Sequence, residues 1–220
     1  MKKMVLLIQL ILFTIVLVWS GIHPIKRSVW FFEVLPAIIL IVVLILTYKR
    51  FPLTPLSYWV IFFGTITMLI GGHYTYARVP FFHDIKTMFH LKRNDFDRFG
   101  HIFYGMVTAV LMREYFIRTN FFHREKWLFV IVGMLSVSLS ALYEIFEFGM
   151  AFLFKGDIQN FLGYQGDIFD SHWDIICALT GAIIILCLGK VHNKQISFIT
   201  KKKNTHKKKY KKPKHQLQPN

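Results

Sequence analysis

The chain has 220 residues, of which 54% are hydrophobic and 17% aromatic, and this composition excludes an ordinary water-soluble domain because too few polar side chains remain to cover its surface. The net charge of +15 does not indicate nucleic-acid binding, since eleven of the 27 basic residues follow Gly189 and belong to a tail. Cys177 and Cys187 lie too far apart along one apolar segment to form a disulfide with each other. An integral membrane protein is therefore expected.

Six hydrophobic segments have the length of about 17 to 25 residues that an α-helix needs to cross a bilayer. They run approximately over residues 4–22, 30–48, 56–72, 99–117, 127–154 and 173–189. The first follows Lys2 and Lys3 as a signal peptide would, but its length and the bulky Trp19 beside the candidate cleavage site favour an uncleaved anchor. The sequence predicts an all-α, polytopic transmembrane helix bundle with six spans.

The carboxyl-terminal segment is rich in lysine and has few large apolar residues. We therefore divide the chain into a six-span transmembrane domain over residues 1–190 and a disordered polybasic tail over residues 191–220. The tail is expected to lie against anionic lipid headgroups, and its removal after Gly189 is expected to leave the fold intact.

The distribution of Lys and Arg predicts the orientation in the membrane. With the amino terminus inside, 19 of the 27 basic residues lie on the cytoplasmic side and 8 on the outer side. Because cytoplasmic segments carry the excess of basic residues, both termini are predicted to be cytoplasmic.

Acidic residues and histidines recur at helical spacing near the predicted outer face. Asp97 and His101 are four residues apart in the fourth span, and Glu144 and Glu147 are three residues apart in the fifth, so each pair shares one side of a helix. The end of the third span and the start of the sixth add further groups. The predicted polar site consists of His73, Asp97, His101, Glu144, Glu147, Asp167, Asp170 and Asp174.

The two glutamates of the fifth span need an explanation, because a charged residue at the centre of a spanning helix costs about 2.5 to 3.5 kcal/mol. Oxygen ligands with one or two imidazoles and no sulfur suit a divalent Mg²⁺, Mn²⁺, Zn²⁺ or Fe²⁺ ion. A carboxylate pair that shares a proton explains the same glutamates. Helix capping explains Asp97, Asp167 and Asp170, and an isolated His101 is also compatible with a structural core histidine. The spacing leaves these alternatives open.

Four ordered motifs, "GGHYTYARVPFF", "RNDFDRFGHIFYG", "SALYEIFEF" and "FLGYQGDIFDSHWDIICALTGA", resemble the YjdF-like family of bacterial inner-membrane proteins of unknown function. The resemblance covers residues 71–182 and leaves out the first two spans and the tail. It implies a polytopic protein of the bacterial plasma (inner) membrane, and it places the family's polar signature on the eight residues above and Gly166. Phe148 stands where the family pattern has Trp. The resemblance implies no substrate, cofactor or mechanism.

Three functions are compatible with these observations. In the first, a metal-dependent membrane hydrolase acts on a lipid or lipid-linked substrate, with Glu144 and Glu147 as catalytic groups and Arg78, Lys92, Arg93 and Arg98 holding an anionic headgroup. In the second, a transporter linked to protons or cations loads them on the two glutamates. In the third, a non-catalytic scaffold uses the polar groups to tie its helices together.

Overall fold

The computed structural model describes residues 3–121, 125–154 and 162–210. Helices account for nearly all regular structure in these ranges, so the predicted all-α class is confirmed. The helices are α1 (Lys3–Gly21), α2 (Arg27–Thr47), α3 (Pro55–Tyr74), α4 (Pro80–Met88), α5 (Phe96–Thr119), α6 (Glu125–Leu153), α8 (Asp170–Cys187) and α9 (Gly189–Tyr210).

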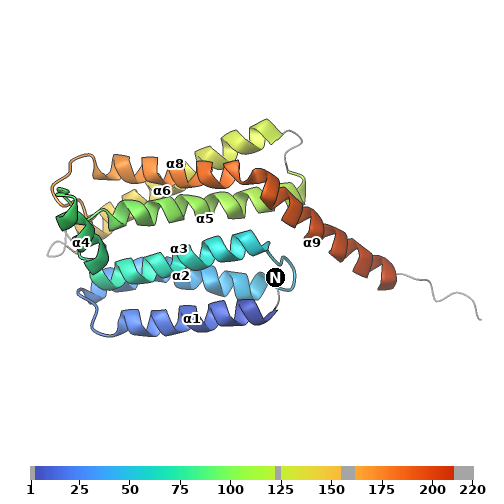
Figure 1. The fold of residues 1–220 in the computed structure, drawn as a ribbon, viewed down its shortest axis with the longest axis horizontal. Helices are drawn as coiled ribbons and strands as arrows, with labels where there is room; N and C mark the ends of the chain where they lie inside the picture. The colour runs from blue at the N-terminus through green and yellow to red at the C-terminus, as the bar shows by residue number, and fades with distance from the viewer. Residues whose placement is uncertain (1–2, 122–124, 155–161, 211–220) are drawn as a thin grey trace, which may run out of the picture.

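The long helices lie side by side, with α1, α2 and α3 on one side of the bundle and α5, α6 and α8 on the other (Figure 1). The short α4 lies at one end of the bundle, and α9 leaves it at the opposite end. We call these the α4 end and the α9 end. The prediction of two cytoplasmic termini assigns the α4 end to the outer face.

Five of these helices, α1, α2, α3, α6 and α8, are long and apolar enough to cross a membrane. Helix α5 is also long, with 24 residues, but it carries ionisable residues near both ends. It packs against α3, α6 and α8 at once. A helix enclosed by others needs little apolar surface toward lipid, which explains its composition. The fourth predicted span, over residues 99–117, stays a prediction that this central position supports.

Two glycines bring the backbones of α5 and α8 unusually close together. A Cβ atom at Gly105 would lie 1.8 Å from the carbonyl oxygen of Ala178, and one at Gly181 would lie 1.9 Å from that of Ile102. Only glycine fits at such contacts, as in other tightly packed membrane helices. The two helices run in the same direction (Figure 1). Their contact therefore fixes the register of α5 against α8.

This register aligns the polar residues of the two helices. His101 lies one turn before Gly105, and Asp174 lies one turn before Ala178, so both precede the same contact on the same helical faces. The glycine contact thus places the imidazole of His101 opposite the carboxylate of Asp174.

At the α9 end, the first turns of α9 are part of the folded body. His192 is fully buried with its Nε2 atom 3.4 Å from the carboxylate of Glu114, and the Gln195 side chain accepts a hydrogen bond from the backbone N–H of Leu56. Glu114 also accepts hydrogen bonds from Ser57 and from Arg118. These contacts hold the start of α9 against α3 and α5.

The predicted boundary at residue 190 therefore needs correction. The helix continues to Tyr210, and His192, Gln195 and Ile196 form a packed stripe at spacings of three and four residues. The lysines around this stripe dominate the composition of residues 190–220, so the apolar and polar residues that pack are not evident from the composition of the sequence. The prediction of disorder for residues 211–220 lies outside the described residues.

Candidate metal centre

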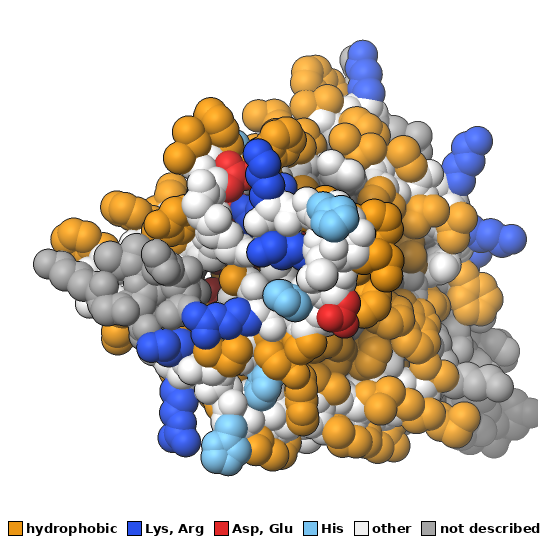
Figure 2. All heavy atoms as spheres, turned by 60° about the vertical axis from the view of Figure 1, so that its left-hand side comes forward, with side chains coloured by type: hydrophobic (Ala, Val, Ile, Leu, Met, Phe, Trp, Pro, Cys, Tyr) orange, Lys and Arg blue, Asp and Glu red, His pale blue; other side chains and the backbone are white. Residues whose placement is uncertain are grey.

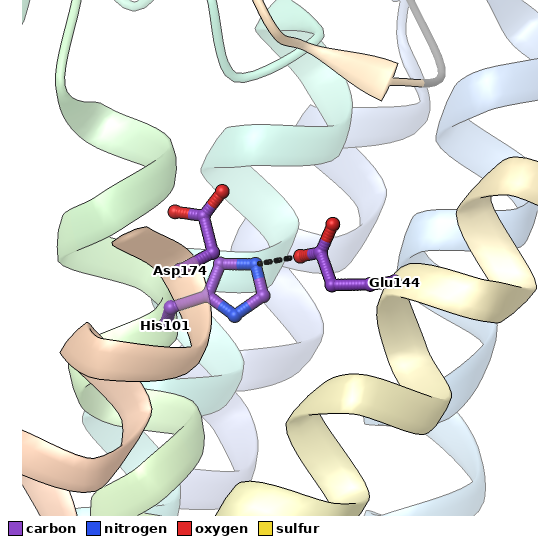
Figure 3. A group of neighbouring side chains, drawn as sticks. All are labelled: His101, Glu144 and Asp174. Carbon is purple, nitrogen blue, oxygen red and sulfur yellow. Dashed lines mark ion pairs between the residues drawn. The ribbon is translucent and has the colours of Figure 1, made fainter. Parts of the chain in front are cut away.

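Ionisable side chains from α5, α6 and α8 converge inside the α4 end of the bundle. His101, Glu144 and Asp174 are neighbours, and one ligand atom from each lies within 4.8 Å of the other two (Figure 3). His101 Nε2 is 3.2 Å from Glu144 Oε1. Two ligands bound to one zinc ion at about 2.0 to 2.2 Å in a tetrahedron are separated by about 3.3 Å. The imidazole and the carboxylate therefore already have the spacing of ligands that share an ion.

A second contact orients the His101 ring. Its Nδ1 atom is 3.3 Å from the hydroxyl of Ser140, which is fully buried on α6 one turn before Glu144. Histidines that bind metal commonly use the other ring nitrogen for such a hydrogen bond, which fixes the tautomer and the direction of the ring. Ser140 thus leaves Nε2 of His101 directed at Glu144 and Asp174.

Asp174 also belongs to a second set. One carboxylate oxygen from each of Asp97, Asp170 and Asp174 lies within 4.8 Å of the others, and all three residues are buried. Arg93 donates a hydrogen bond to Oδ1 of Asp170, which leaves Oδ2 of that carboxylate for another partner. The two sets share Asp174 and together form the candidate metal centre.

Three carboxylate oxygens of this centre are buried and have no hydrogen-bond partner among the described residues. They are Oδ2 of Asp170, Oδ1 of Asp174 and Oε1 of Glu144, the last of which makes the ion pair with Nε2 of His101 at 3.2 Å. A buried carboxylate without a partner is strongly unfavourable, so the oxygens of Asp170 and Asp174 require a cation, a proton or water, and the Glu144 oxygen requires one as well when His101 is neutral. They come from α6 and α8 and belong to the two sets just described.

Arginines neutralise the acids at the rim of the centre. Arg93 lies between Asp170 and Asp95, and Arg98 contacts Asp95 at 3.2 Å and Asp167 at 2.6 Å. Burial opposes the charge of the Arg93 guanidinium, but the hydrogen bond and the charge of Asp170 prevail and raise its pKa. These interactions engage two of the four basic residues that we expected to hold an anionic headgroup.

Asp167 lies at the edge of the centre. Its carboxylate accepts a hydrogen bond from the backbone N–H of Phe169 and binds Arg98, and these contacts lower its pKa. Helix α8 begins three residues later, at Asp170, so Asp167 stabilises the turn before the helix. It contributes no ligand to either set.

Of the other predicted site residues, Glu147 joins the cluster and His73 does not. Glu147 is buried one turn after Glu144, and its carboxylate interacts electrostatically with those of Glu144 and Asp97. The Nδ1 atom of His73 lies 2.8 Å from the carbonyl oxygen of Ser20, and the His73 ring stacks on Trp19 at 4.6 Å. His73 therefore connects α3 to α1.

The segment before α8 covers the centre from the α4 end. Gly163 has a left-handed φ of 61°, and a Cβ atom there would lie 2.9 Å from Oδ2 of Asp97. Two reciprocal hydrogen bonds of 2.9 Å join the Gln165 side chain to the backbone of Asn94. Figure 2 views this end, where basic and histidine side chains gather and hydrophobic side chains surround them.

Sequence reasoning missed Glu33 on α2. This side chain is 2% exposed, and its carboxylate accepts a 2.5 Å hydrogen bond from the hydroxyl of Tyr143. Glu33 is the only acidic residue before Asp84, and it interrupts a strongly apolar span. An isolated acid in a spanning helix is a functional candidate by default, and this signal could have found it.

The fold and this centre define a polytopic α-helical membrane protein with a buried acidic site. The chain belongs to the family described as "Predicted membrane protein (DUF2238)", whose model matches residues 5–195. It is 35% identical over 197 residues to the inner membrane protein YjdF of Escherichia coli K12, covering 89% of this chain and 94% of that protein. No solved structure matches. The YjdF-like family is confirmed, and the match includes the first two spans, which the motifs alone had left out.

Proposed function

We propose that this protein is a divalent-metal-dependent membrane hydrolase that acts on a lipid or lipid-linked substrate. The observation that supports this most is the pair of three-residue sets that share Asp174 and contain three buried carboxylate oxygens without a hydrogen-bond partner among the described residues. Catalytic zinc sites typically use three protein ligands and keep a further position for water or substrate, whereas structural sites use four protein ligands. Each set has the ligand number of a catalytic site.

The charges are also compatible with this proposal. Asp97, Glu144, Asp170 and Asp174 carry four negative charges when ionised, and Arg93 balances the one on Asp170, so the remaining charge suits one or two divalent ions. Asp174 belongs to both sets and would therefore contribute to holding either ion. Sites with two metal ions recur in phosphatases, nucleases and aminopeptidases, where they bind the attacking water and the leaving group. One ion in the set of His101, Glu144 and Asp174 is the minimal form of the centre.

A divalent ion held by His101, Glu144 and Asp174 would lower the pKa of water and so supply hydroxide for attack on the ester or phosphoester group of the substrate. Glu147 would take up the proton that the water loses and would give it to the leaving oxygen as the bond to the leaving group breaks. Glu144 acts as a ligand and holds His101 in place. The surface of the α4 end, above the centre, carries many hydrophobic side chains around its basic and histidine groups (Figure 2), and such a surface suits a substrate presented from a membrane leaflet.

Metal analysis of the full-length protein in neutral detergent tests the proposal. We expect one or two equivalents of Zn²⁺, Mn²⁺, Mg²⁺ or Fe²⁺ in the wild type, and a higher melting temperature after the preferred ion is restored to chelated protein. Glu144→Gln and Asp174→Asn should each lose this effect. Asp84→Asn on α4, an exposed acid outside both sets, is the matched control and should keep it. A wild type without bound metal, whose melting temperature ignores chelators and divalent ions, would overturn the proposal.

A cation-linked transporter is the second candidate, and one observation favours it. A cavity next to His101 continues along α5 past Val107 to Thr108, toward the middle of the bundle. Uptake of the bound metal into proteoliposomes distinguishes the two functions. Metal that binds but is not transported agrees with the hydrolase. If the protein neither binds metal nor transports a cation, the non-catalytic scaffold is the remaining candidate function.

A further inference from the structure

A cavity of about 130 Å³ lies beside the candidate metal centre, between α2, α3, α5 and α6. Asp97 and His101 line it on the side of the centre, and Tyr76, Tyr104 and Tyr143 line it elsewhere. A water molecule in the liquid occupies about 30 Å³, so the cavity has room for about four water-sized groups. This is enough for an ammonium group with methyl or methylene substituents.

The hydroxyl groups of the three tyrosines are engaged elsewhere. Tyr143 donates to Glu33 at 2.5 Å, Tyr104 donates to the carbonyl oxygen of Leu139 at 3.3 Å, and the Tyr76 side chain also hydrogen-bonds Glu33. Tyrosines held in this way present mainly ring carbons to the cavity. The Tyr104 and Tyr143 ring centroids are 5.4 Å apart, and the His101 ring lies 6.2 Å from each. Aromatic rings gathered around a small space attract a desolvated cation.

The surrounding charges favour the same ligand. Among the described residues, none that lines the cavity is Lys or Arg, and Arg93 and Arg98 at the rim are paired with Asp170 and Asp167. Asp97 lines the cavity, and Glu33 lies behind the tyrosine hydroxyls. Two divalent ions and Arg93 would carry five positive charges, and the four acids of the metal centre together with Glu33 and Glu147 carry six negative charges when ionised, so the surroundings stay acidic. An anionic headgroup is therefore disfavoured here.

We infer that this cavity binds an amine-bearing group of the substrate, a primary or quaternary ammonium held by the tyrosine rings, with Asp97 at the cavity wall and the charge of Glu33 behind the rings. The inference rests on the proposed hydrolase function and narrows its substrate to a lipid or lipid-linked molecule with a cationic headgroup. The ammonium group then lies directly beside the metal centre, because Asp97 and His101 belong to both. This arrangement positions the neighbouring ester or phosphoester for attack.

Binding of tetramethylammonium, choline and ethanolamine to full-length, metal-loaded protein in neutral detergent tests the inference. We expect saturable binding by calorimetry and a rise in melting temperature, with no comparable effect from glycerol or inorganic phosphate. Tyr104→Leu should weaken binding at least tenfold, and Tyr104→Phe, which keeps the ring, should stay within about threefold of the wild type. Tyr115→Leu, an exposed tyrosine on the same helix, is the matched control.

A second variant distinguishes loss of the cavity from a general loss of structure. Leu40→Trp fills the cavity from α2 without changing a residue of either ligand set and should abolish amine binding while metal content stays at the wild-type value. The inference falls if no amine binds, if glycerol or phosphate binds equally well, or if binding survives in both Tyr104→Leu and Leu40→Trp. Metal content measured on the same samples separates this failure from failure of the proposed hydrolase.

Discussion

Replacing Gly105 by alanine should separate α5 from α8 and weaken the candidate metal centre. The added Cβ atom would lie 1.8 Å from the carbonyl oxygen of Ala178. Carbon and carbonyl oxygen in contact between helices are normally about 3.3 to 3.6 Å apart, so the two backbones must move apart by roughly 1.5 Å at this point. The atom in the way is backbone, so a change of rotamer cannot relieve the clash.

The displacement acts one turn from the ligands on both helices. His101 on α5 and Asp174 on α8 then move apart by a similar distance, whereas metal–ligand distances tolerate only about 0.2 Å. Overpacking of this kind also costs typically about 1 to 3 kcal/mol of stability. We expect Gly105→Ala to bind metal at least tenfold more weakly and to melt at a lower temperature.

Gly149→Ala on α6 is the matched control, because a Cβ atom there meets nothing within 4 Å. This variant should keep the wild-type metal affinity, and its free energy of unfolding should rise by up to about 1 kcal/mol because alanine has a better helix propensity than glycine. Metal binding is measured by competition with a chelating dye, and stability by the melting temperature in neutral detergent. A Gly105→Ala protein that retains both wild-type metal affinity and wild-type melting temperature would refute the argument from close packing.

Three further predictions concern orientation, the α9 end and pH. On a background without the native cysteines, an impermeant thiol reagent outside the cell should label a cysteine at position Lys92 and spare one at Lys194; the opposite pattern would reverse the topology. Truncation after Gly189 should lower the melting temperature, whereas truncation after Lys201 should not, because the packed turns of α9 precede residue 201; equal melting temperatures would contradict the packing. The pKa of Asp167 is lower in the folded protein than its ordinary value of 3.8, so the ionised carboxylate stabilises the fold above pH 3.8. This contribution should disappear as the pH falls through the folded-state pKa. Asp167→Asn should therefore weaken the pH dependence of the melting temperature on the acid side, and an unchanged pH dependence would contradict this.

Local patterns in the sequence were sufficient for the class of fold and indicated most of the residues that form the candidate metal centre. The length of an apolar segment is set by the thickness of the bilayer, so the spans could be read without knowledge of their neighbours. The spacings of Asp97 with His101 and of Glu144 with Glu147 place each pair on one helical face whatever the helix packs against. Such features depend on residues only a few positions apart.

The meeting of those faces depended on the tertiary structure. Helices in lipid associate through shape, close packing and polar contacts, and not through a general preference for apolar surface, so hydropathy does not tell which faces meet. The contact between Gly105 and Ala178 decided that His101 faces Asp174, and the contact between His73 and Ser20 turned the predicted ligand His73 toward α1.

The tertiary structure also brought in Glu33, whose partner Tyr143 lies 110 residues away in the sequence. It made the start of α9 part of the folded body, because His192 meets the buried Glu114 of α5. Periodicity within one helix carries no information on such pairs. They are decided by the complementary shapes and polar groups of two helices that are distant along the chain, which become neighbours only when the bundle is assembled.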